Sequence, residues 1–167
     1  MKELLIQLAA YNSWANQRLI DCIQALPEET ALKQMPSSFN TLQATLLHMW
    51  DAESIWWQRM KLQEGVIAPS VNFKGTTRDV SNALLHQNKL WESWVNNASP
   101  AALDHQFMYY NSKREPYKMN INQMLLQVFN HDTYHRGQLV NMLRQLEIKK
   151  IPGTDFVIWA RSVKKTS

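Results

Sequence analysis

The most strongly periodic stretch of the chain is INQMLLQVFNHDTYHRGQLVNMLRQL, residues 121–146. Its apolar residues recur every three or four positions, the spacing that places side chains on one face of an α-helix. At 100° per residue they fall within an arc of about 60°: Met124, Val128, Leu139, Met142 and Leu146. A helix with such a stripe buries it against other helices. The stretch therefore predicts a long helix facing a core of helices.

Three other stretches have the same periodicity and similar length. They run from about Lys2 to Leu26, from about Thr41 to Gln63, and from near TTRD (76–79) to about Asn97. Pro27 ends the first, and the second stops near Gly65. Four long helices with connections of uneven length predict an all-α fold, a four-helix bundle, in a single domain covering residues 1–167.

The remaining segments predict smaller elements. PEETALKQMPSSFN (27–40) contains two prolines and is predicted to be a loop. HQFMYYNSKREPYKMN (105–120) has two short β-like runs around NSKRE, which indicates a β-hairpin between the third and fourth helices. IPGTDFVIWARS (151–162) predicts one more short helix.

Composition excludes several classes of protein. Among 167 residues there is one cysteine, Cys22, so neither an internal disulfide nor a cysteine-rich metal site is available. No apolar run approaches the roughly 18 residues of a membrane span, and the first residues do not resemble a signal peptide, so we expect a cytoplasmic protein. The net charge of +4 raises nucleic acid as a partner. The basic residues are scattered, however, and the densest group, ARSVKKTS (160–167), accompanies no nucleic-acid-binding motif.

Two histidines lie on the apolar stripe of the fourth predicted helix. His131 and His135 are four residues apart, so their imidazoles project from adjacent turns of one face and could chelate one metal ion. A tight site needs a third ligand, and His48 on the second helix, at the edge of its apolar stripe, is the candidate. Three neutral imidazoles leave a coordination position open, as in catalytic metal sites. The alternative is that His131 and His135 are core residues hydrogen-bonded to buried neighbours.

The segment HDTYH (131–135) shares the His-x-x-x-His spacing of zinc metalloproteases. In those enzymes a glutamate follows the first histidine and acts as general base. Here the residue is Asp132, whose side chain is one methylene shorter, and Asn141 occupies the position of the third histidine of the extended motif. We therefore do not expect a protease.

Four segments, in order and spacing, resemble the DinB/YfiT-like family of four-helix-bundle metalloproteins: YNSWANQRL (11–19), LLHMWDAESIWWQRM (46–60), NHDTYHRGQL (130–139) and PGTDFVIWAR (152–161). The resemblance spans nearly the whole chain. It implies that His48, His131 and His135 form a three-histidine site for a divalent ion, nickel or zinc above all.

The resemblance also implies a class of chemistry. Relatives use the metal to activate a low-molecular-weight thiol and transfer it to an electrophile, so we expect a metal-dependent thiol S-transferase or hydrolase acting on a small-molecule substrate. No protein side chain is identified as the catalytic residue: the reactive species would be a water or thiolate held by the metal. The alternative is a non-enzymatic metal-binding stress-response protein. Dimers are common in the family, which predicts a homodimer.

Several neighbouring residues have open roles. Asp132 could hydrogen-bond a ligand imidazole, or it could pair with Asn16 or Arg136. Gln138 could reach the edge of the site. Gly137, costly in a helix, suggests a close approach by another helix or a ligand. We expect no role in the chemistry for the remaining groups: Asp51 and Glu53 as exposed carboxylates, Cys22 as a buried and inert thiol, and His86 and His105 as surface or loop residues.

Overall fold

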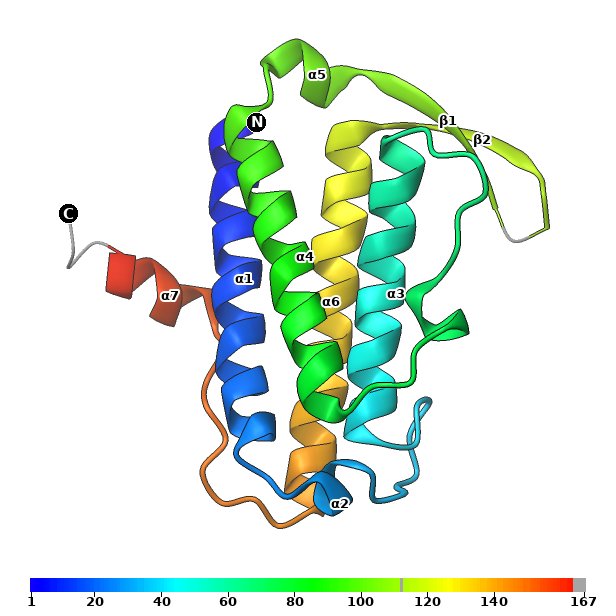
Figure 1. The fold of residues 1–167 in the computed structure, drawn as a ribbon. Coiled ribbons are helices and arrows are strands. Elements are labelled where there is room, and N and C mark those ends of the chain that lie inside the picture. The colour runs from blue at the N-terminus through cyan, green and yellow to red at the C-terminus, as the bar shows by residue number, and fades with distance from the viewer. Residues whose placement is uncertain (112, 164–167) are drawn as a thin grey trace.

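The computed structural model describes residues 1–111 and 113–163, and four long helices dominate it (Figure 1). They are α1 (Lys2–Gln24), α3 (Leu42–Met60), α4 (Thr77–Asn97) and α6 (Ile121–Gln145). The predicted four-helix bundle is therefore confirmed, with every long helix close to its expected limits.

The four helices follow one another around a square in the order α1, α4, α3, α6. Both α1 and α3 pack against α4 and α6, which places α1 diagonal to α3. In Figure 1, α1 and α6 run in one direction, and α3 and α4 run in the other. The connection between α3 and α4 must therefore return along the bundle. It includes the short 3-10 helix η1 (Pro69–Val71), which is held to α3 where the Ser70 N–H donates to Asp51 Oδ1 at 2.8 Å.

Side chains cap the starts of these helices. At α3, Thr41 Oγ1 accepts a hydrogen bond from the Ala44 N–H at 3.0 Å. At α4, the Asp79 N–H donates to Thr76 Oγ1, and the Asp79 carboxylate accepts from the Thr76 N–H in return. These bonds occupy amide groups that have no partner within the first turn of a helix. They explain why the helices begin where Ser, Thr and Asp occur in the sequence.

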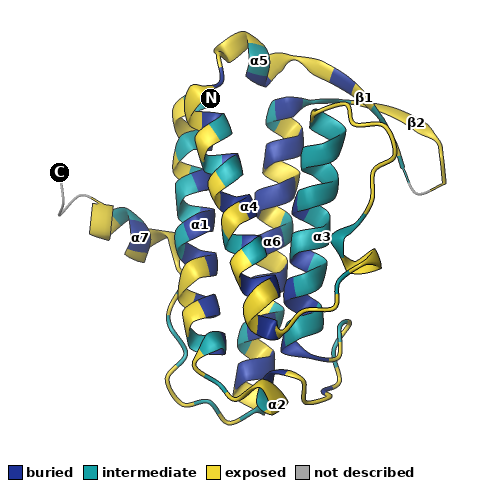
Figure 2. Cartoon of the chain, in the orientation of Figure 1, coloured by how far each residue is buried: buried dark blue, intermediate teal, exposed yellow. Residues whose placement is uncertain are grey.

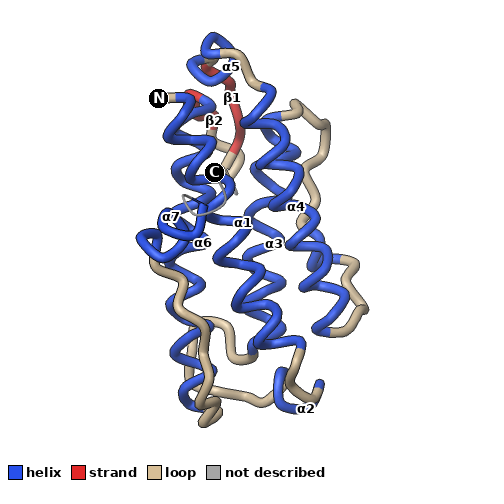
Figure 3. The backbone as a smooth tube through the Cα atoms, turned by 90° about the vertical axis from the view of Figure 1, so that its left-hand side faces the viewer, coloured by secondary structure: helices blue, strands red, loops and turns tan. Residues whose placement is uncertain are grey.

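A predicted hairpin and a predicted terminal helix are both present. Strands β1 (Gln106–Tyr110) and β2 (Pro116–Asn120) pair antiparallel, with Phe107 opposite Met119. The turn includes residue 112, which lies outside the described residues. The hairpin lies at the end of the bundle where α3 ends and α6 begins (Figure 3). Helix α7 (Phe156–Val163) follows the last connection, and the basic residues 164 and 165 lie outside the described part of the chain.

Two short helices were not predicted. Helix α5 (Pro100–Asp104) precedes the hairpin, and α2 (Glu28–Ala31) falls within the segment 27–40 that was predicted to be a loop. The loop prediction was wrong at α2 because Pro27 is compatible with a helix start, and acidic side chains in the first turn favour the positive end of a helix. The Glu28 carboxylate also accepts the Thr77 N–H at 2.8 Å, which ties α2 to the start of α4.

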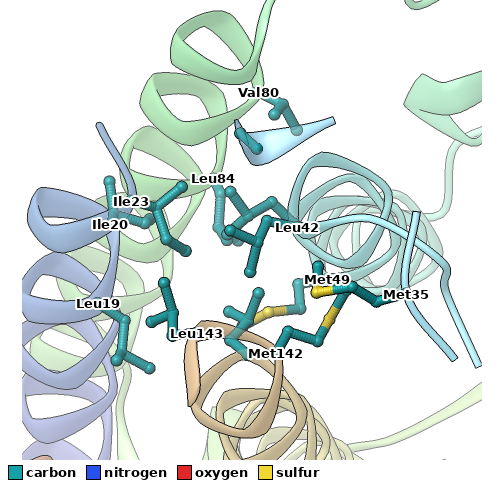
Figure 4. Packing of buried hydrophobic residues seen from close by; sticks show 13 residues of the cluster. Leu19, Ile20, Ile23, Met35, Leu42, Met49, Val80, Leu84, Met142 and Leu143 are labelled. Atoms are coloured by element: carbon teal, nitrogen blue, oxygen red, sulfur yellow. The ribbon is translucent and has the colours of Figure 1, made fainter. Parts of the chain in front are cut away.

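The core consists of two apolar clusters, and Figure 2 shows the buried residues facing the bundle interior. The lower apolar cluster, drawn in Figure 4, lies near the end of the bundle that carries α2. The upper apolar cluster lies near the hairpin. Its fully buried members include Leu5, Trp91, Met124 and Leu125, and those of the lower cluster include Leu19, Ile23, Leu46, Leu84 and Met142.

A layer of buried polar side chains separates the two clusters. On each long helix, polar positions interrupt the apolar stripe at the same height. We call this set the polar layer: Asn12, Asn16, Glu53, Asn88, Asp132 and Arg136. In the described residues no helix combines the length and apolarity needed to cross a membrane.

Candidate metal centre

Three histidines from two helices converge beside the polar layer. His48 projects from α3, and His131 and His135 project from α6, which packs against it. The Nε2 atom of His131 lies 3.1 Å from His48 Nε2 and 3.0 Å from His135 Nε2. The sequence predicted these residues as a set, and the fold brings all three together.

The spacing of these nitrogens fits a divalent ion. Nitrogen ligands lie about 2.0–2.1 Å from zinc, so two of them at 90–109° around one ion are about 3.0–3.4 Å apart. The two measured separations from His131 Nε2 lie at the lower end of that range. Across the described residues, the cluster that could hold an ion consists of these three histidines, whose ligand atoms lie within 4.8 Å of one another.

The neighbour of His135 fixes which nitrogen carries the proton. His135 Nδ1 lies 2.7 Å from Gln138 Oε1, an acceptor that requires an N–H on Nδ1. The same amide directs its Nε2 towards Tyr134 Oη at 3.3 Å, which is consistent with this orientation. His135 Nε2 then presents a lone pair to the centre of the cluster. The expectation that Gln138 reaches the site is borne out by this contact.

All three imidazoles are held in the neutral form that a metal requires. Burial, together with the neighbouring His135 and His131, lowers the pKa of His48 from its ordinary value to about 4. Burial is also the largest cause of the lowered pKa values of His131 and His135. Because an imidazolium has no lone pair, a depressed pKa keeps the cluster ready for a cation at neutral pH.

One side of the cluster is accessible. His135 is buried, whereas His48 and His131 are half-buried. The Phe39 ring stacks on His48 with centroids 4.1 Å apart, and the exposed Tyr134 packs edge-on against His135. Aromatic rings thus pack against two of the three imidazoles, and the half-buried His48 and His131 leave the cluster partly accessible.

Asp132 belongs to the polar layer rather than to the histidine cluster. Its Oδ2 accepts hydrogen bonds from Asn12 Nδ2 at 2.8 Å and from Asn16 Nδ2 at 2.7 Å. The oxygens of both amides accept from Arg136 Nη1, at 2.6 and 2.9 Å. The two asparagines therefore connect a buried carboxylate to a buried guanidinium. Of the alternatives left open for Asp132, the pairing with Asn16 is the one present.

The prediction that Glu53 is an exposed carboxylate was wrong. It is fully buried in the polar layer, where its Oε1 accepts from Asn88 Nδ2 at 2.6 Å. Glu53 Oε2 and Asp132 Oδ1 have no N–H or O–H donor in the described residues. A proton shared between the two carboxyl groups supplies the missing hydrogen bond. Burial, and then the charge of Asp132, raise the pKa of Glu53 well above its usual range.

Glu53 could have been found from the sequence. It lies four residues after Met49 and three before Trp56, which places it at the centre of the apolar stripe of α3. A carboxylate at such a position is buried whenever its helix faces a core. Its partners, in contrast, come from three other helices and leave no local signal.

Other expectations had mixed outcomes. The close approach suggested by Gly137 is not found, and an incidental glycine fits instead: the residue is exposed, and an added Cβ would meet no atom within 4 Å. Asp51 is half-buried and binds the η1 segment, rather than being simply exposed. Cys22 is a free thiol, half-buried, and its burial raises its pKa, so it is poorly suited to act as a nucleophile. His86 and His105 are exposed, as expected.

The fold and the cluster together define a class of protein, the helical bundles that carry three convergent histidines on two packed helices. Comparison with known proteins identifies the family. The model of the DinB family matches residues 1–161, and the chain belongs to that family.

Two relatives support this assignment. The chain is 24% identical to Protein DinB of Bacillus subtilis (strain 168) in an alignment 166 positions long, which covers 95% of each chain. It also superimposes on the crystal structure of a DinB-like protein from Bacillus cereus with a TM-score of 0.70. That match covers 90% of this chain and 95% of the other at 18% identity, so it supports the fold alone.

Proposed function

We propose that the chain acts as a single domain that binds one divalent metal ion, nickel or zinc, through the Nε2 atoms of His48, His131 and His135. The observation that carries the proposal is the convergence of three neutral imidazoles whose nitrogens lie 3.0–3.1 Å from His131 Nε2. In the metal-free protein, an N–H on His131 Nε2 would occupy this space. A divalent cation would instead accept a lone pair from all three rings at once, which their neutral form allows.

The residues around the histidines have separate roles in this proposal. Gln138 holds His135 in the tautomer that directs Nε2 at the ion. Phe39 covers one face of His48 and limits how far that ring can rotate. The polar layer holds α6 against α1 through Asp132 and Arg136, which keeps the two α6 histidines at a fixed position relative to α3.

We further propose that the protein is an enzyme of the cytoplasm, a thiol S-transferase or hydrolase with a low-molecular-weight thiol as cosubstrate. A divalent ion at such a site favours thiolate over thiol and holds it beside a second reactant. The partial exposure of His48 and His131 supports this, as does the number of candidate ligands, because a purely structural site is closed by four protein ligands and this cluster offers three.

Elemental analysis tests the metal site. Protein purified without a histidine tag or chelator should contain about one divalent ion per chain, and His131→Ala should lose it. His86→Ala is the matched control, because His86 is exposed on α4 and should leave the metal content unchanged. If wild type and His131→Ala retain equal metal after reconstitution with zinc or nickel, the histidines are ordinary core residues and the proposal fails.

Measuring turnover distinguishes an enzyme from a non-enzymatic metal-binding protein. We expect thiol consumption with an electrophile by the metal-loaded protein, and a loss of more than about 100-fold in His48→Ala, His131→Ala and His135→Ala with helical content retained. Equal rates in wild type and the triple variant would contradict the enzymatic role.

The alternative is a non-enzymatic stress-response protein in which the ion stabilises the bundle. The position of the cluster favours this reading as well, since an ion would join α3 to α6 directly. In that case a chelator lowers the melting temperature strongly while no thiol or electrophile binds to the loaded protein.

We also propose that the protein forms a homodimer. Helix α7 leaves apolar side chains exposed, with Val157 51% and Ile158 42% accessible, and a second copy could cover them. Sedimentation at micromolar concentration should give the mass of two chains, and a mass of one chain would refute the dimer.

A further inference from the structure

A cavity lies at the hairpin end of the bundle, between α3 and the β1–β2 hairpin. Its volume is about 740 Å³, within the range of sites for small molecules. Ile55 and Arg59 of α3 form one wall, the connection after α3 with Val66 forms a second, and Met108 and Tyr109 of β1 form a third. Three separate segments of the chain therefore enclose a space open to solvent.

Arg59 is held in this wall without a hydrogen-bonded partner. Its guanidinium lies over the Trp56 ring at 4.7 Å and over the Tyr109 ring at 5.2 Å. Among the described residues, no hydrogen bond or salt bridge to the Arg59 guanidinium is found, although the Arg59 backbone carbonyl accepts from the Leu62 N–H. Stacking fixes the plane of the guanidinium but uses none of its five N–H donors. A half-buried, positioned and unpaired guanidinium is a ready partner for a carboxylate.

The other charges of the cavity also favour an anion. Arg114 and Glu64 line it together with Arg59, so two cations face one carboxylate. Burial lowers the pKa of Arg59, which is the direction expected for a cation that lacks a counter-charge. The remaining wall is apolar and accessible, with Met108 52% exposed and Val66 38% exposed. Such a wall suits the apolar body of a ligand whose charged end meets Arg59.

This cavity is distinct from the histidine cluster. His48 and Arg59 are eleven residues apart on α3, which at 1.5 Å per residue separates them by about 16 Å, and at 100° per residue leaves them within about 20° of one face. A ligand with one or two rings bound at Arg59 is too short to reach the histidines. The two sites nevertheless lie along the same side of α3.

The geometry points to the cavity between α3 and the hairpin as a binding site for a small aromatic carboxylate, held by the Arg59 guanidinium and packed against Tyr109 and Met108. This site does not depend on the proposed metal function, because its residues are separate from the three histidines. It adds a ligand class that the cluster alone does not indicate.

Isothermal titration of the protein as purified with 2-naphthoate and with the neutral 2-naphthamide tests the assignment. Both ligands share the ring system, so their difference reports the charge. We expect naphthoate to bind at least about tenfold more tightly than naphthamide, because a charge-assisted, bidentate contact is lost in the amide. Arg59→Gln should remove that preference and leave naphthamide binding unchanged.

Three further variants localise the effect. Arg59→Lys keeps the positive charge and the alkyl stem, and should retain part of the preference while losing the planar fork. Arg144→Gln removes an exposed arginine from the other end of α6 and should change nothing. His131→Ala should also leave naphthoate binding unchanged, which separates this site from the metal site.

Several outcomes would overturn the inference. It fails if naphthoate shows no binding up to millimolar concentration, or if naphthoate and naphthamide bind equally. It also fails if Arg59→Gln keeps the preference for naphthoate. Loss of naphthoate binding in His131→Ala alone would assign the carboxylate to the metal and would overturn the cavity site while supporting the metal centre.

Discussion

The histidine cluster and the polar layer are neighbours in the bundle, with His131 and Asp132 consecutive on α6, yet their polar groups are satisfied in opposite ways. In the polar layer, donors face acceptors: Asn12 and Asn16 stand between Arg136 and Asp132 and bond to both. In the cluster, three groups of the same kind face one another, because the Nε2 atoms of His48 and His135 both lie within 3.1 Å of His131 Nε2.

This difference assigns different purposes to the two regions. Buried polar groups with complementary partners cost little and fix the relative positions of the helices that carry them. Three imidazoles that converge on one point can share only a single N–H at His131 Nε2, whereas a divalent cation would accept a lone pair from each ring. The polar layer is therefore a structural device complete in itself, whereas the histidine cluster is completed by a ligand.

The largest effect is expected from breaking the polar layer. Asp132→Ala removes the acceptor of Asn12 and Asn16 and the negative charge nearest along this network to buried Arg136, and leaving a buried charge uncompensated costs about 3–5 kcal/mol of unfolding free energy. Urea denaturation of metal-free protein measures it. Asp132→Asn, which retains an oxygen acceptor, should cost less. An Asp132→Ala protein as stable as wild type would show that the layer contributes nothing to stability.

A smaller effect is expected from a change that leaves the three histidines in place and alters only the orientation of one ring. Gln138→Ala removes the acceptor that orients His135, and loss of such a partner reduces metal affinity by about 10- to 100-fold. Competition with a chromophoric chelator measures the dissociation constant. Gln138→Glu preserves an acceptor and is the control. Unchanged affinity in Gln138→Ala would mean that the helix alone fixes the ring.

Lowering the pH should destabilise the metal-free protein through His48. His48 has a pKa of about 4 in the fold, below its ordinary 6.5, so between these values the unfolded chain binds a proton that the folded chain does not. The unfolding free energy should therefore fall as pH decreases from about 6.5 towards about 4. Urea midpoints at several pH values should show a steeper loss for wild type than for His48→Ala. Parallel profiles would remove His48 as the cause.

The smallest effect is expected from a neutral replacement in the layer. Because the pKa of Glu53 is raised, its folded form holds a proton above the ordinary 4.5, and its contribution to stability decreases as pH rises beyond that value. Glu53→Gln should change stability by less than about 1 kcal/mol near pH 5 and gain relative to wild type towards pH 8. Glu53→Leu is the destabilising control, because it leaves the Asn88 amide buried without its acceptor. A difference between wild type and Glu53→Gln that does not vary with pH would contradict the shared proton.

The long helices could be predicted from the sequence because their apolar residues are periodic. The stripe from Met124 to Met142 defines α6, and the same spacing defines the other long helices, because a helix that faces a core must repeat at 3.6 residues. Helix α2 escaped prediction because its four residues are too few to show a period. The hairpin was found from its β-like runs and the turn between them.

The site was partly predictable for the same reason. His131 and His135 lie on one stripe, so their proximity follows from helical geometry alone. His48 is 83 residues from His131, and their contact depends on how α3 packs against α6, which no local pattern contains. Asn12, Asn88 and Glu53 each interrupt an apolar stripe, yet their pairing could be recognised only after four helices were assembled.

The division of the core into two apolar clusters has a consequence for how this sequence can vary. Since the polar layer stands between them, a change of volume in the lower cluster, such as at Leu46, need not be accommodated by the upper cluster around Trp91. Substitutions in the two halves should therefore combine additively. Each half can be redesigned on its own, and chimaeras joined at the polar layer should inherit the packing of both parents.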